Sequence, residues 1–214
     1  MHDLRVVILD FDGVVLESNA VKTEAFRSVF ARFPEHADAM MDFHFAHVSL
    51  SRFAKFDHLL ERMGRAGDEA LKTDLASDFS RRTLEGILSV PFVAGAEAFL
   101  RAMTPRVPVY LASVTPADDL TLILERRGLS HWFRGVYACP PWTKPDAIRD
   151  VLARESTEPA QALLVGDSAG DQSAAMQTGV QFVARDSGLG FDAPQPVTFP
   201  DLFGVAEFVG KRLA

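Results

Sequence analysis

The sequence of 214 residues predicts an α/β fold, in which a parallel β-sheet carries helices on both faces and a helical segment is inserted after the first strand. Two observations support this prediction. Short apolar runs rich in β-branched residues alternate with helical patterns along most of the chain, as is typical of parallel sheets. Between about residues 18 and 89 the alternation stops, and apolar residues recur only at helical spacing.

Apolar runs of strand length define the expected sheet. The four strongest are Leu4–Leu9, Val107–Ala112, Ala162–Val165 and Gln181–Ala184, and Phe133–Tyr137 is a weaker fifth. Such continuous apolar runs are expected of strands that are covered on both faces.

Helical patterns lie between the expected strands. They cover Ala94–Met103, Pro116–Arg127, Lys144–Arg154 and Ala169–Gln177, the last ending at Gly179. Thr115 is the expected N-cap of the second of these helices, with Pro116 at its first position. The Gly- and Pro-rich stretch Gly188–Pro200 predicts a surface loop.

The inserted segment predicts several helices. Its apolar residues fall into two groups at helical spacing, which are Ala25, Phe26, Val29 and Phe30, then Phe53, Phe56, Leu59, Leu60 and Met63. Val90–Gly95 has the composition of a linker that returns to the sheet. We therefore expect a core domain of residues 1–16 and 90–214, and a helical domain of residues 17–89.

The composition argues against two classes of binding partner, nucleic acids and membranes. The formal net charge is -7, and the sequence contains no Lys/Arg cluster of the kind that binds nucleic acid or anionic membranes. The single cysteine, Cys139, excludes an intrachain disulfide and fits a reducing compartment. The first apolar run, Val6–Leu9, is too short for a signal peptide or a membrane span. We expect a cytoplasmic protein with no nucleic-acid or membrane partner.

Acidic residues follow two of the predicted strands. Asp10 and Asp12 come directly after the first, and Asp167 and Asp171 follow Ala162–Val165. In an open α/β sheet, ligands bind beyond the carboxyl ends of the strands. Two further polar residues belong to the same predicted edge, because Ser113 ends a strand and Lys144 opens a helix.

This set of side chains suits phosphoryl transfer. The Asp10 carboxylate could attack phosphorus and form an aspartyl-phosphate, and Mg²⁺ held by Asp10 and by Asp167 or Asp171 would offset the repulsion between two anions. Lys144 and Ser113 would contact the phosphoryl oxygens. Asp12 would protonate the leaving oxygen and then deprotonate the attacking water.

Each of these residues also has a purely structural explanation. An Asp at a strand end is more often a helix cap or a turn former, Lys144 could be a solvated helix start, and Ser113 could cap a helix. The order in the chain favours catalysis: an acid pair after the first strand, a hydroxyl after the second, a lysine, and then Gly166-Asp167-x-x-x-Asp171.

In these motifs the sequence resembles the haloacid dehalogenase-like hydrolases. Asp10-Phe11-Asp12-Gly13-Val14-Val15 matches the first motif of the family, Ser113 the second, Lys144-Pro145 the third, and Gly166-Asp167-Ser168-Ala169-Gly170-Asp171 the fourth. The resemblance implies a Rossmann-like core with an inserted helical cap of the C1 type. It also implies Mg²⁺ bound by Asp10, the backbone carbonyl of Asp12 and Asp167, with Asp171 in support.

Departures from the family pattern and candidate cap residues bear on the substrate. Val114 follows Ser113 where many relatives carry Asn. Ser51-Arg52 is similar to the substrate-specificity loop of β-phosphoglucomutase-like caps, so Arg52 could bind a distal anionic or hydroxyl group or form part of an exposed helix face. Lys22 stands where many relatives have a histidine near the site. His44 and His47 are loop candidates without a predicted partner, and Trp142 is expected to pack.

The leading hypothesis is hydrolysis of a small phosphomonoester by a monomer or a dimer. Asp12 argues against a haloacid dehalogenase, since those enzymes lack the second acid. A β-phosphoglucomutase-like phosphomutase shares the four motifs and stays open. A phosphonatase that uses Lys22 or Lys55 as a Schiff base is disfavoured, because neither lysine lies in the pattern of that motif. A non-catalytic binding protein is disfavoured because Asp10, Asp12 and Lys144 are all present.

Overall fold

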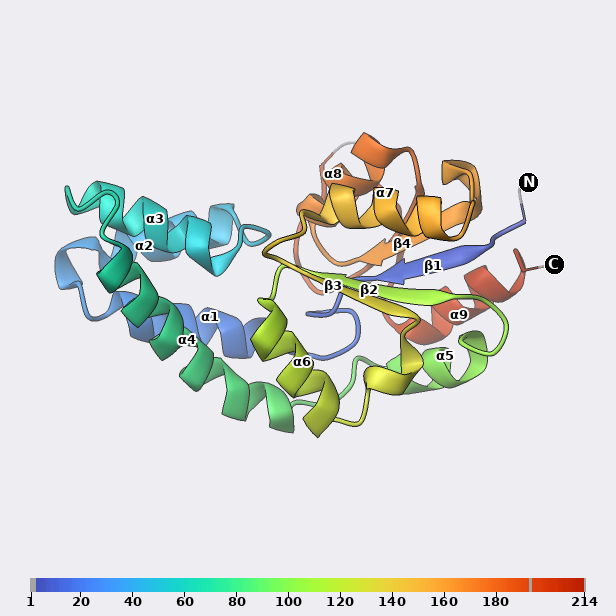
Figure 1. Cartoon of the computed structure of the whole chain (residues 1–214), viewed down its shortest axis with the longest axis horizontal. Helices are drawn as coiled ribbons and strands as arrows, with labels where there is room; N and C mark the ends of the chain where they lie inside the picture. Colours follow the sequence, from blue (N-terminus) through green and yellow to red (C-terminus); the bar gives the residue numbers. More distant parts are fainter. Residues whose placement is uncertain (1–2, 193, 214) are drawn as a thin grey trace. The chain divides into compact units, whose positions relative to one another are not determined.

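The computed structural model of the chain describes residues 3–192 and 194–213. Its described residues form one parallel sheet of six strands, in the order β3-β2-β1-β4-β5-β6 (Figure 1). The strands are β1 (Val6–Leu9), β2 (Val109–Ser113), β3 (Gly135–Ala138), β4 (Ala162–Gly166), β5 (Gln181–Arg185) and β6 (Val197–Phe199). The predicted α/β fold with a parallel sheet is therefore confirmed.

Helices cover both faces of this sheet (Figure 1). They are α5 (Ala96–Met103), α6 (Ala117–Arg126), α7 (Lys144–Arg154), α8 (Ala169–Thr178) and α9 (Leu202–Gly210), with 3₁₀ turns at Ser130–Trp132 and Pro159–Gln161. The helices α7 and α8 contact the central strands β2 and β4 from one side, and α5 and α9 pack together on the other. Strands covered on both faces must be apolar throughout, which explains the continuous apolar runs in the sequence.

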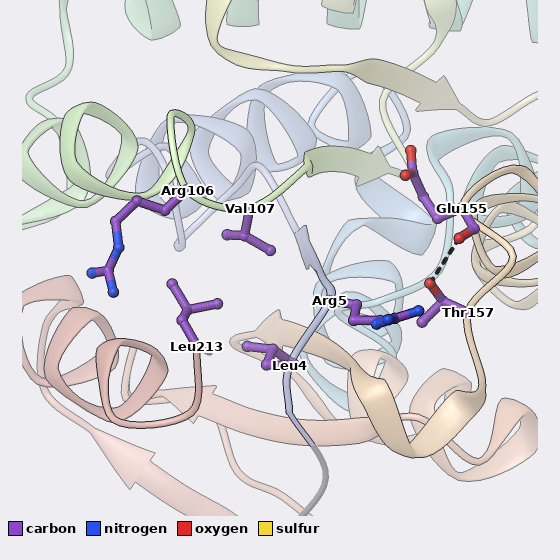
Figure 2. A pocket seen from close by; sticks show the side chains of 7 residues that line it. All are labelled: Leu4, Arg5, Arg106, Val107, Glu155, Thr157 and Leu213. Atoms are coloured by element: carbon purple, nitrogen blue, oxygen red, sulfur yellow. Dashed lines mark hydrogen bonds between the residues drawn. The ribbon is translucent and has the colours of Figure 1, made fainter.

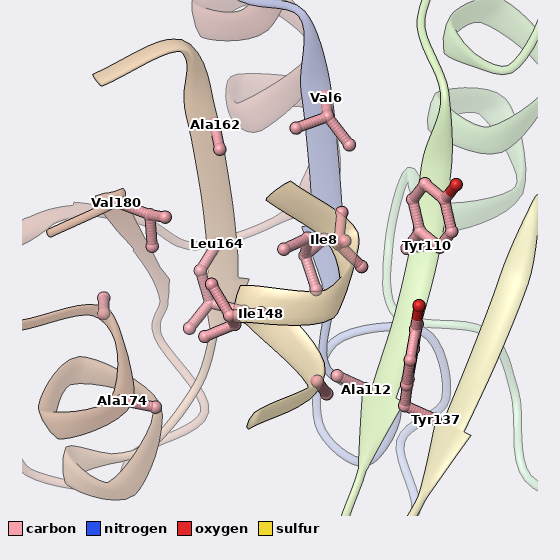
Figure 3. Packing of buried hydrophobic residues seen from close by; sticks show 13 residues of the cluster. Val6, Ile8, Tyr110, Ala112, Tyr137, Ile148, Ala162, Leu164, Ala174 and Val180 are labelled. Carbon is pink, nitrogen blue, oxygen red and sulfur yellow. The ribbon is translucent and has the colours of Figure 1, made fainter. Parts of the chain in front are cut away.

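Alternate residues of the strands build the core beneath α7 and α8. Figure 3 shows Val6 and Ile8 of β1, Leu164 of β4 and Tyr110 of β2 in one cluster with Ile148 of α7. Each of these side chains is at most 3% exposed. Trp142 packs at the margin of this cluster, edge-on to the Tyr137 ring with 5.1 Å between ring centroids, as expected of a packing residue.

Two local expectations are wrong. The stretch Gly188–Pro200, expected to be only loop, contains β6, which pairs with β5 at the edge of the sheet. An edge strand needs a partner on one side only, so three residues with β-propensity suffice despite the flanking prolines. The helix expected from Pro116 begins at Ala117, because Pro116 is extended (ψ 151°), and the Thr115 hydroxyl donates to Asp12 rather than capping the helix.

The chain divides into two compact units, one formed by Met1–Glu17 and Pro91–Ala214, the other by Ser18–Val90. The second, which we call the helical unit, contains α1 (Asn19–Phe30), α2 (Pro34–Ala46), α3 (Arg52–Arg62) and α4 (Glu69–Ser89). Ser51 and Asp68 cap α3 and α4 by accepting hydrogen bonds from the amides of Ala54 and Leu71. No helix among the described residues is long and apolar enough to span a membrane.

The helical unit has its own aromatic core, and a lysine lies against it. The Phe26, Phe30, Phe56 and Phe79 side chains are each at most 4% exposed and make pairwise ring contacts. Lys55 is 1% exposed, and its ammonium nitrogen lies 4.7 Å from the centre of the Phe26 ring.

His44 accompanies this lysine. Its ring nitrogens lie 2.9 Å from Lys55 Nζ and 3.1 Å from the Thr23 hydroxyl. The loop positions expected for His44 and His47 are wrong, since His44 lies within α2 and His47 is the C-cap residue of that helix. Burial lowers the pKa of His44 to about 4, and the nearby lysine adds to this effect. The histidine is therefore an uncharged packing residue at neutral pH.

Burial of Lys55 predicts an unusual dependence of stability on pH. Burial, together with the charge of Lys22, lowers the pKa of Lys55 to about 7 from its ordinary value of 10.5. Between pH 7 and 10.5 the unfolded chain then binds more protons than the folded chain, so stability rises with pH in that window. Urea denaturation of the wild type should give an unfolding free energy for the helical unit about 1–3 kcal/mol higher at pH 9.5 than at pH 7.

Lys55→Met should remove most of this rise. Lys72→Met is the matched control, because Lys72 forms an ordinary ion pair with Asp57 (2.6 Å) on the same unit. If Lys55→Met and the wild type show the same pH dependence, Lys55 is charged in the folded protein at neutral pH.

Candidate active site

Three buried carboxylates meet beyond the carboxyl ends of β1 and β4. Asp10 directly follows β1, and its amide donates to the carbonyl of Val165 in β4 (2.9 Å). Asp167 follows β4, and Asp171 lies in the first turn of α8. One oxygen from each of the three carboxylates lies within 4.8 Å of the other two. Adjacent parallel strands thus bring together acids that are about 160 positions apart in the sequence.

The loop after Asp10 turns back sharply and positions Asp12. The Phe11 carbonyl accepts hydrogen bonds from the amides of Val15 (2.9 Å) and Leu16 (3.2 Å), and Gly13 has a left-handed backbone (φ 71°) that favours glycine. Asp12 is 8% exposed, and one of its carboxylate oxygens accepts a hydrogen bond from the Thr115 hydroxyl at 3.2 Å. Thr115 therefore orients the second acid, a role that its place in the sequence, as an expected helix N-cap, did not indicate.

Asp171 organises the turn that carries Asp167. One of its oxygens accepts hydrogen bonds from the amides of Asp167 and Ser168, each at 3.2 Å, and from the Ser168 hydroxyl at 2.6 Å. Ser168 and Asp171 form a capping box at the start of α8, a pattern visible in the sequence as S-x-x-D. A Cβ atom at Gly166 would lie 2.2 Å from the Asp171 Cβ, so only glycine allows this approach.

Lys144 contacts carboxylates from both segments of the cluster, the one after β1 and the one after β4. It is the first residue of α7, whose N-cap Thr143 accepts a hydrogen bond from the amide of Asp146. The ammonium nitrogen of Lys144 lies 2.9 Å from an Asp10 oxygen and also donates to Asp171. Ser113, the last residue of β2, is 5% exposed, and its hydroxyl oxygen accepts a hydrogen bond from the amide of Thr115 at 3.1 Å.

Burial dominates the electrostatics of this site. It raises the pKa of Asp10 to about 8, and the carboxylates of Asp171, Asp167 and Asp12 add to the rise while Lys144 opposes it. Burial by itself would lower the pKa of Lys144, but Asp10 and Asp171 raise it above its ordinary value, so Lys144 is charged at neutral pH. One ammonium group is thus shared by two carboxylates, and a third carboxylate lies beside them.

The donor set fits a hard divalent cation. Carboxylate oxygens are the ligands that Mg²⁺ prefers, and three of them converge within the buried cluster. A cation there would offset the repulsion among the acids and favour the ionised form of Asp10. The residues that could hold it are Asp10, Asp167 and Asp171.

The remaining predicted site residues, Arg52 and Lys22, belong to the helical unit. Arg52 is 6% exposed and begins α3, where its guanidinium donates to the Ser80 hydroxyl (2.5 Å) and lies 4.5 Å from the centre of the Phe79 ring. The alternative of an exposed helix face is therefore wrong for Arg52. Lys22 lies in the first turn of α1 and is partly buried.

A pocket of about 330 Å³ lies at the amino ends of β1 and β2, opposite the ends that carry the acid cluster. Figure 2 shows its lining from the segments that precede β1 and β2, including Arg5 and Arg106, with Glu155 and Thr157 on one side. Thr157 donates a hydrogen bond to the backbone carbonyl of Glu155 at 3.0 Å. Because Asp10 and Ser113 lie at the other ends of these strands, this pocket is separate from the acid cluster.

Comparisons with known proteins agree with the motifs. Residues 7–185 match the model of the haloacid dehalogenase-like hydrolase family, and the chain belongs to that family. The resemblance noted in the sequence is thereby confirmed, as is the prediction that the protein is an enzyme. A phosphoglycolate phosphatase of Synechococcus elongatus is 28% identical over 188 residues, which are 85% of this chain and 83% of that protein.

Solved structures share the fold over nearly the whole chain. A predicted phosphoglycolate phosphatase from Haemophilus somnus superposes with a TM-score of 0.74 at 16% identity, covering 97% of this chain and 99% of that one. The β-phosphoglucomutase from Clostridium difficile gives a TM-score of 0.73 at 14% identity, covering 97% and 98%. At these identities the similarity establishes the fold alone.

Cation binding at the carboxylate cluster should stabilise the protein. With Mg²⁺ at about 100 times its dissociation constant, the melting temperature measured by calorimetry should rise by about 5–10 °C. Asp167→Asn should lose most of this rise, because it removes a ligand from the cluster. Asp118→Asn, an exposed acid in the first turn of α6, is the matched control and should keep it. A full Mg²⁺-induced rise in Asp167→Asn would place the cation elsewhere.

Proposed function

We propose that the protein is a Mg²⁺-dependent phosphatase, which hydrolyses a small phosphomonoester through a phosphorylated Asp10. The observation that supports this most strongly is the placement of Asp10, whose carboxylate lies 2.9 Å from the Lys144 ammonium and within 4.8 Å of the Asp167 and Asp171 carboxylates. A buried carboxylate that lies between the Lys144 ammonium and two further carboxylates, which could hold a metal ion, suits attack on an anionic phosphorus centre.

In the first step an Asp10 oxygen forms a bond to phosphorus, and the bond from phosphorus to the leaving oxygen breaks. Asp12 gives its proton to that oxygen, so that an alcohol departs. Lys144 and the Ser113 hydroxyl contact the phosphoryl oxygens and stabilise the charge that develops on them. Bound Mg²⁺ would neutralise the phosphoryl group as a Lewis acid, held by Asp10, Asp167 and the Asp12 carbonyl, with Asp171 in support.

In the second step water hydrolyses the aspartyl-phosphate. Asp12, now ionised, removes a proton from the water as it attacks phosphorus, and the Asp10 carboxylate is released with inorganic phosphate. The hydrogen bond from Thr115 to Asp12 supports this dual role, because it fixes the carboxylate in one orientation.

The proposed substrate is a phosphosugar or a related small metabolite. The name of the Synechococcus elongatus relative supports a small phosphorylated acid as one candidate. Arg52 and Lys22 of the helical unit are the proposed contacts for the part of the substrate beyond the phosphate. Hydrogen bonding to Ser80 and stacking on Phe79 hold the Arg52 guanidinium in place, as a specificity residue requires.

The phosphomutase alternative differs only in the acceptor of the phosphoryl group, which would be a second sugar rather than water. The fold shared with a β-phosphoglucomutase is compatible with it. A Schiff base on Lys55 is not part of the proposal, since that amine is 1% exposed and donates to the Val48 carbonyl. The cytoplasmic location and the monomeric or dimeric state remain predictions.

Asp10→Asn should abolish turnover, because the amide cannot act as the nucleophile. The measurement is phosphate release from phosphosugars, phosphoglycolate and nucleotides, with and without Mg²⁺. Asp118→Asn should retain wild-type activity. Magnesium-dependent release that survives Asp10→Asn would contradict the mechanism, and isomerisation with a bisphosphate primer but little phosphate release would identify a phosphomutase.

Arg52→Ala should reduce kcat/KM for the best natural substrate by about 10- to 100-fold, the loss expected for one charge-assisted hydrogen bond. The same variant should hydrolyse p-nitrophenyl phosphate almost normally, because that ester has no distal polar group. Arg62→Ala, an exposed arginine in the last turn of the same helix, is the control. Equal losses on both substrates would exclude a role of Arg52 in selecting substrate.

A further inference from the structure

Arg185, the last residue of β5, contacts the loop that carries Asp12. Its Nη1 donates to the Gly13 carbonyl and to a Glu17 carboxylate oxygen, each at 3.2 Å, and its Nη2 donates to the other Glu17 oxygen. The guanidinium thus binds Glu17 in a bidentate manner, the geometry that fixes an arginine most firmly. The Arg185 side chain is only 11% exposed.

The contact with Arg185 fixes Glu17, which ends the loop that follows Asp12. Glu17 is the last residue before the helical unit, and its amide donates to the carbonyl of Pro91, the first residue after that unit (3.1 Å). Within the loop, the Gly13 amide donates to the Leu16 carbonyl at 2.8 Å. Arg185 therefore holds both ends of the short segment that begins immediately after Asp12.

The residues that follow β5 also contact the turn that carries Asp167. The Ser187 hydroxyl donates to the backbone carbonyl of Asp167 at 3.3 Å. Since β4 lies between β1 and β5 in the sheet, the Arg185 side chain extends past β4 to reach the loop after β1. Residues 185–187 thus connect the loop of Asp12 to the turn of Asp167.

A contribution to the stability of the fold does not explain why an arginine occupies position 185. Its Nε is buried, and no hydrogen-bond acceptor for it is found in the part of the chain that the structure describes. A buried donor without an acceptor is destabilising, and an ion pair whose Glu17 side chain is 37% exposed contributes little to stability. A role in fixing the geometry of the loop explains why a guanidinium occupies this position.

We propose that Arg185 is a positioning residue, which acts through Glu17 and the Gly13 carbonyl to hold Asp12 where it exchanges a proton with the leaving oxygen. The inference rests on the proposed function, in which Asp12 is the acid. It predicts a specific signature, because proton donation matters for an alkoxide leaving group and hardly at all for p-nitrophenolate.

The test compares Arg185→Met, Arg185→Lys and Glu17→Gln on p-nitrophenyl phosphate and on the best alkyl phosphate found by the phosphate-release assay. For Arg185→Met, kcat/KM on the alkyl ester, which reports the first step, should fall about 10- to 100-fold, and kcat/KM on the aryl ester should change about 3-fold at most. Hydrolysis of the aspartyl-phosphate is common to both esters, so kcat does not separate them. Arg185→Lys should recover part of the loss. Glu17→Gln, which keeps the size of the side chain, should show the same pattern more weakly.

Arg154→Met is the matched control, since Arg154 forms an exposed ion pair with Asp150 at the end of α7. It should leave both activities unchanged. Equal losses of kcat/KM on both esters in Arg185→Met, or no loss on either, would overturn the inference.

A second measurement does not depend on activity. Amide hydrogen exchange of residues 13–17 should be faster in Arg185→Met than in Arg154→Met, and unchanged exchange would overturn the role of Arg185 even in an enzyme with normal phosphatase activity. If the wild type hydrolyses neither ester, the proposed function fails and the assignment to Asp12 fails with it. Faster exchange in that case would still show that Arg185 holds the loop.

Discussion

Electrostatic repulsion among the carboxylates at the end of β1 and β4 is the constraint on which the site depends. Asp10, Asp167 and Asp171 are buried within 4.8 Å of one another, and burial together with this crowding raises the pKa of Asp10 to about 8. Lys144 offsets part of the negative charge by contacting Asp10 and Asp171. Asp10 in such a setting is ionised most readily when a cation is bound, so that its protonation state and cation binding depend on each other.

The parallel sheet makes this crowding possible. Its strands end at one edge, and the backbone pairing of β1 with β4 sets the separation of the two acid segments. Asp171 then fixes the turn of Asp167 by accepting three hydrogen bonds, and Thr115 orients Asp12. A rigid apolar core beneath α7 and α8 supports the same edge, which limits the freedom of each carboxylate.

The helical unit is held together by an aromatic core rather than by a sheet. Its four phenylalanines form a compact aromatic core, and α3 begins with Arg52, held against α4 by Ser80 and Phe79. Lys55, buried beside His44, reduces the stability of this unit at neutral pH. The contacts of Asp10, in contrast, lie within the unit that contains the sheet.

The sequence by itself determined the fold class and the inserted helices. It also predicted which acids, serine and lysine lie at the carboxyl ends of the strands, because strand-end residues of a parallel sheet converge whatever joins the strands. It did not reveal the orientation of these groups. The bond from Thr115 to Asp12 joins residues 103 positions apart, and the pairing of Arg185 with Glu17 joins residues 168 positions apart. Such contacts depend on strand order and side-chain direction, which only the tertiary structure decides, and β6 formed for the same reason, as the partner of an exposed sheet edge.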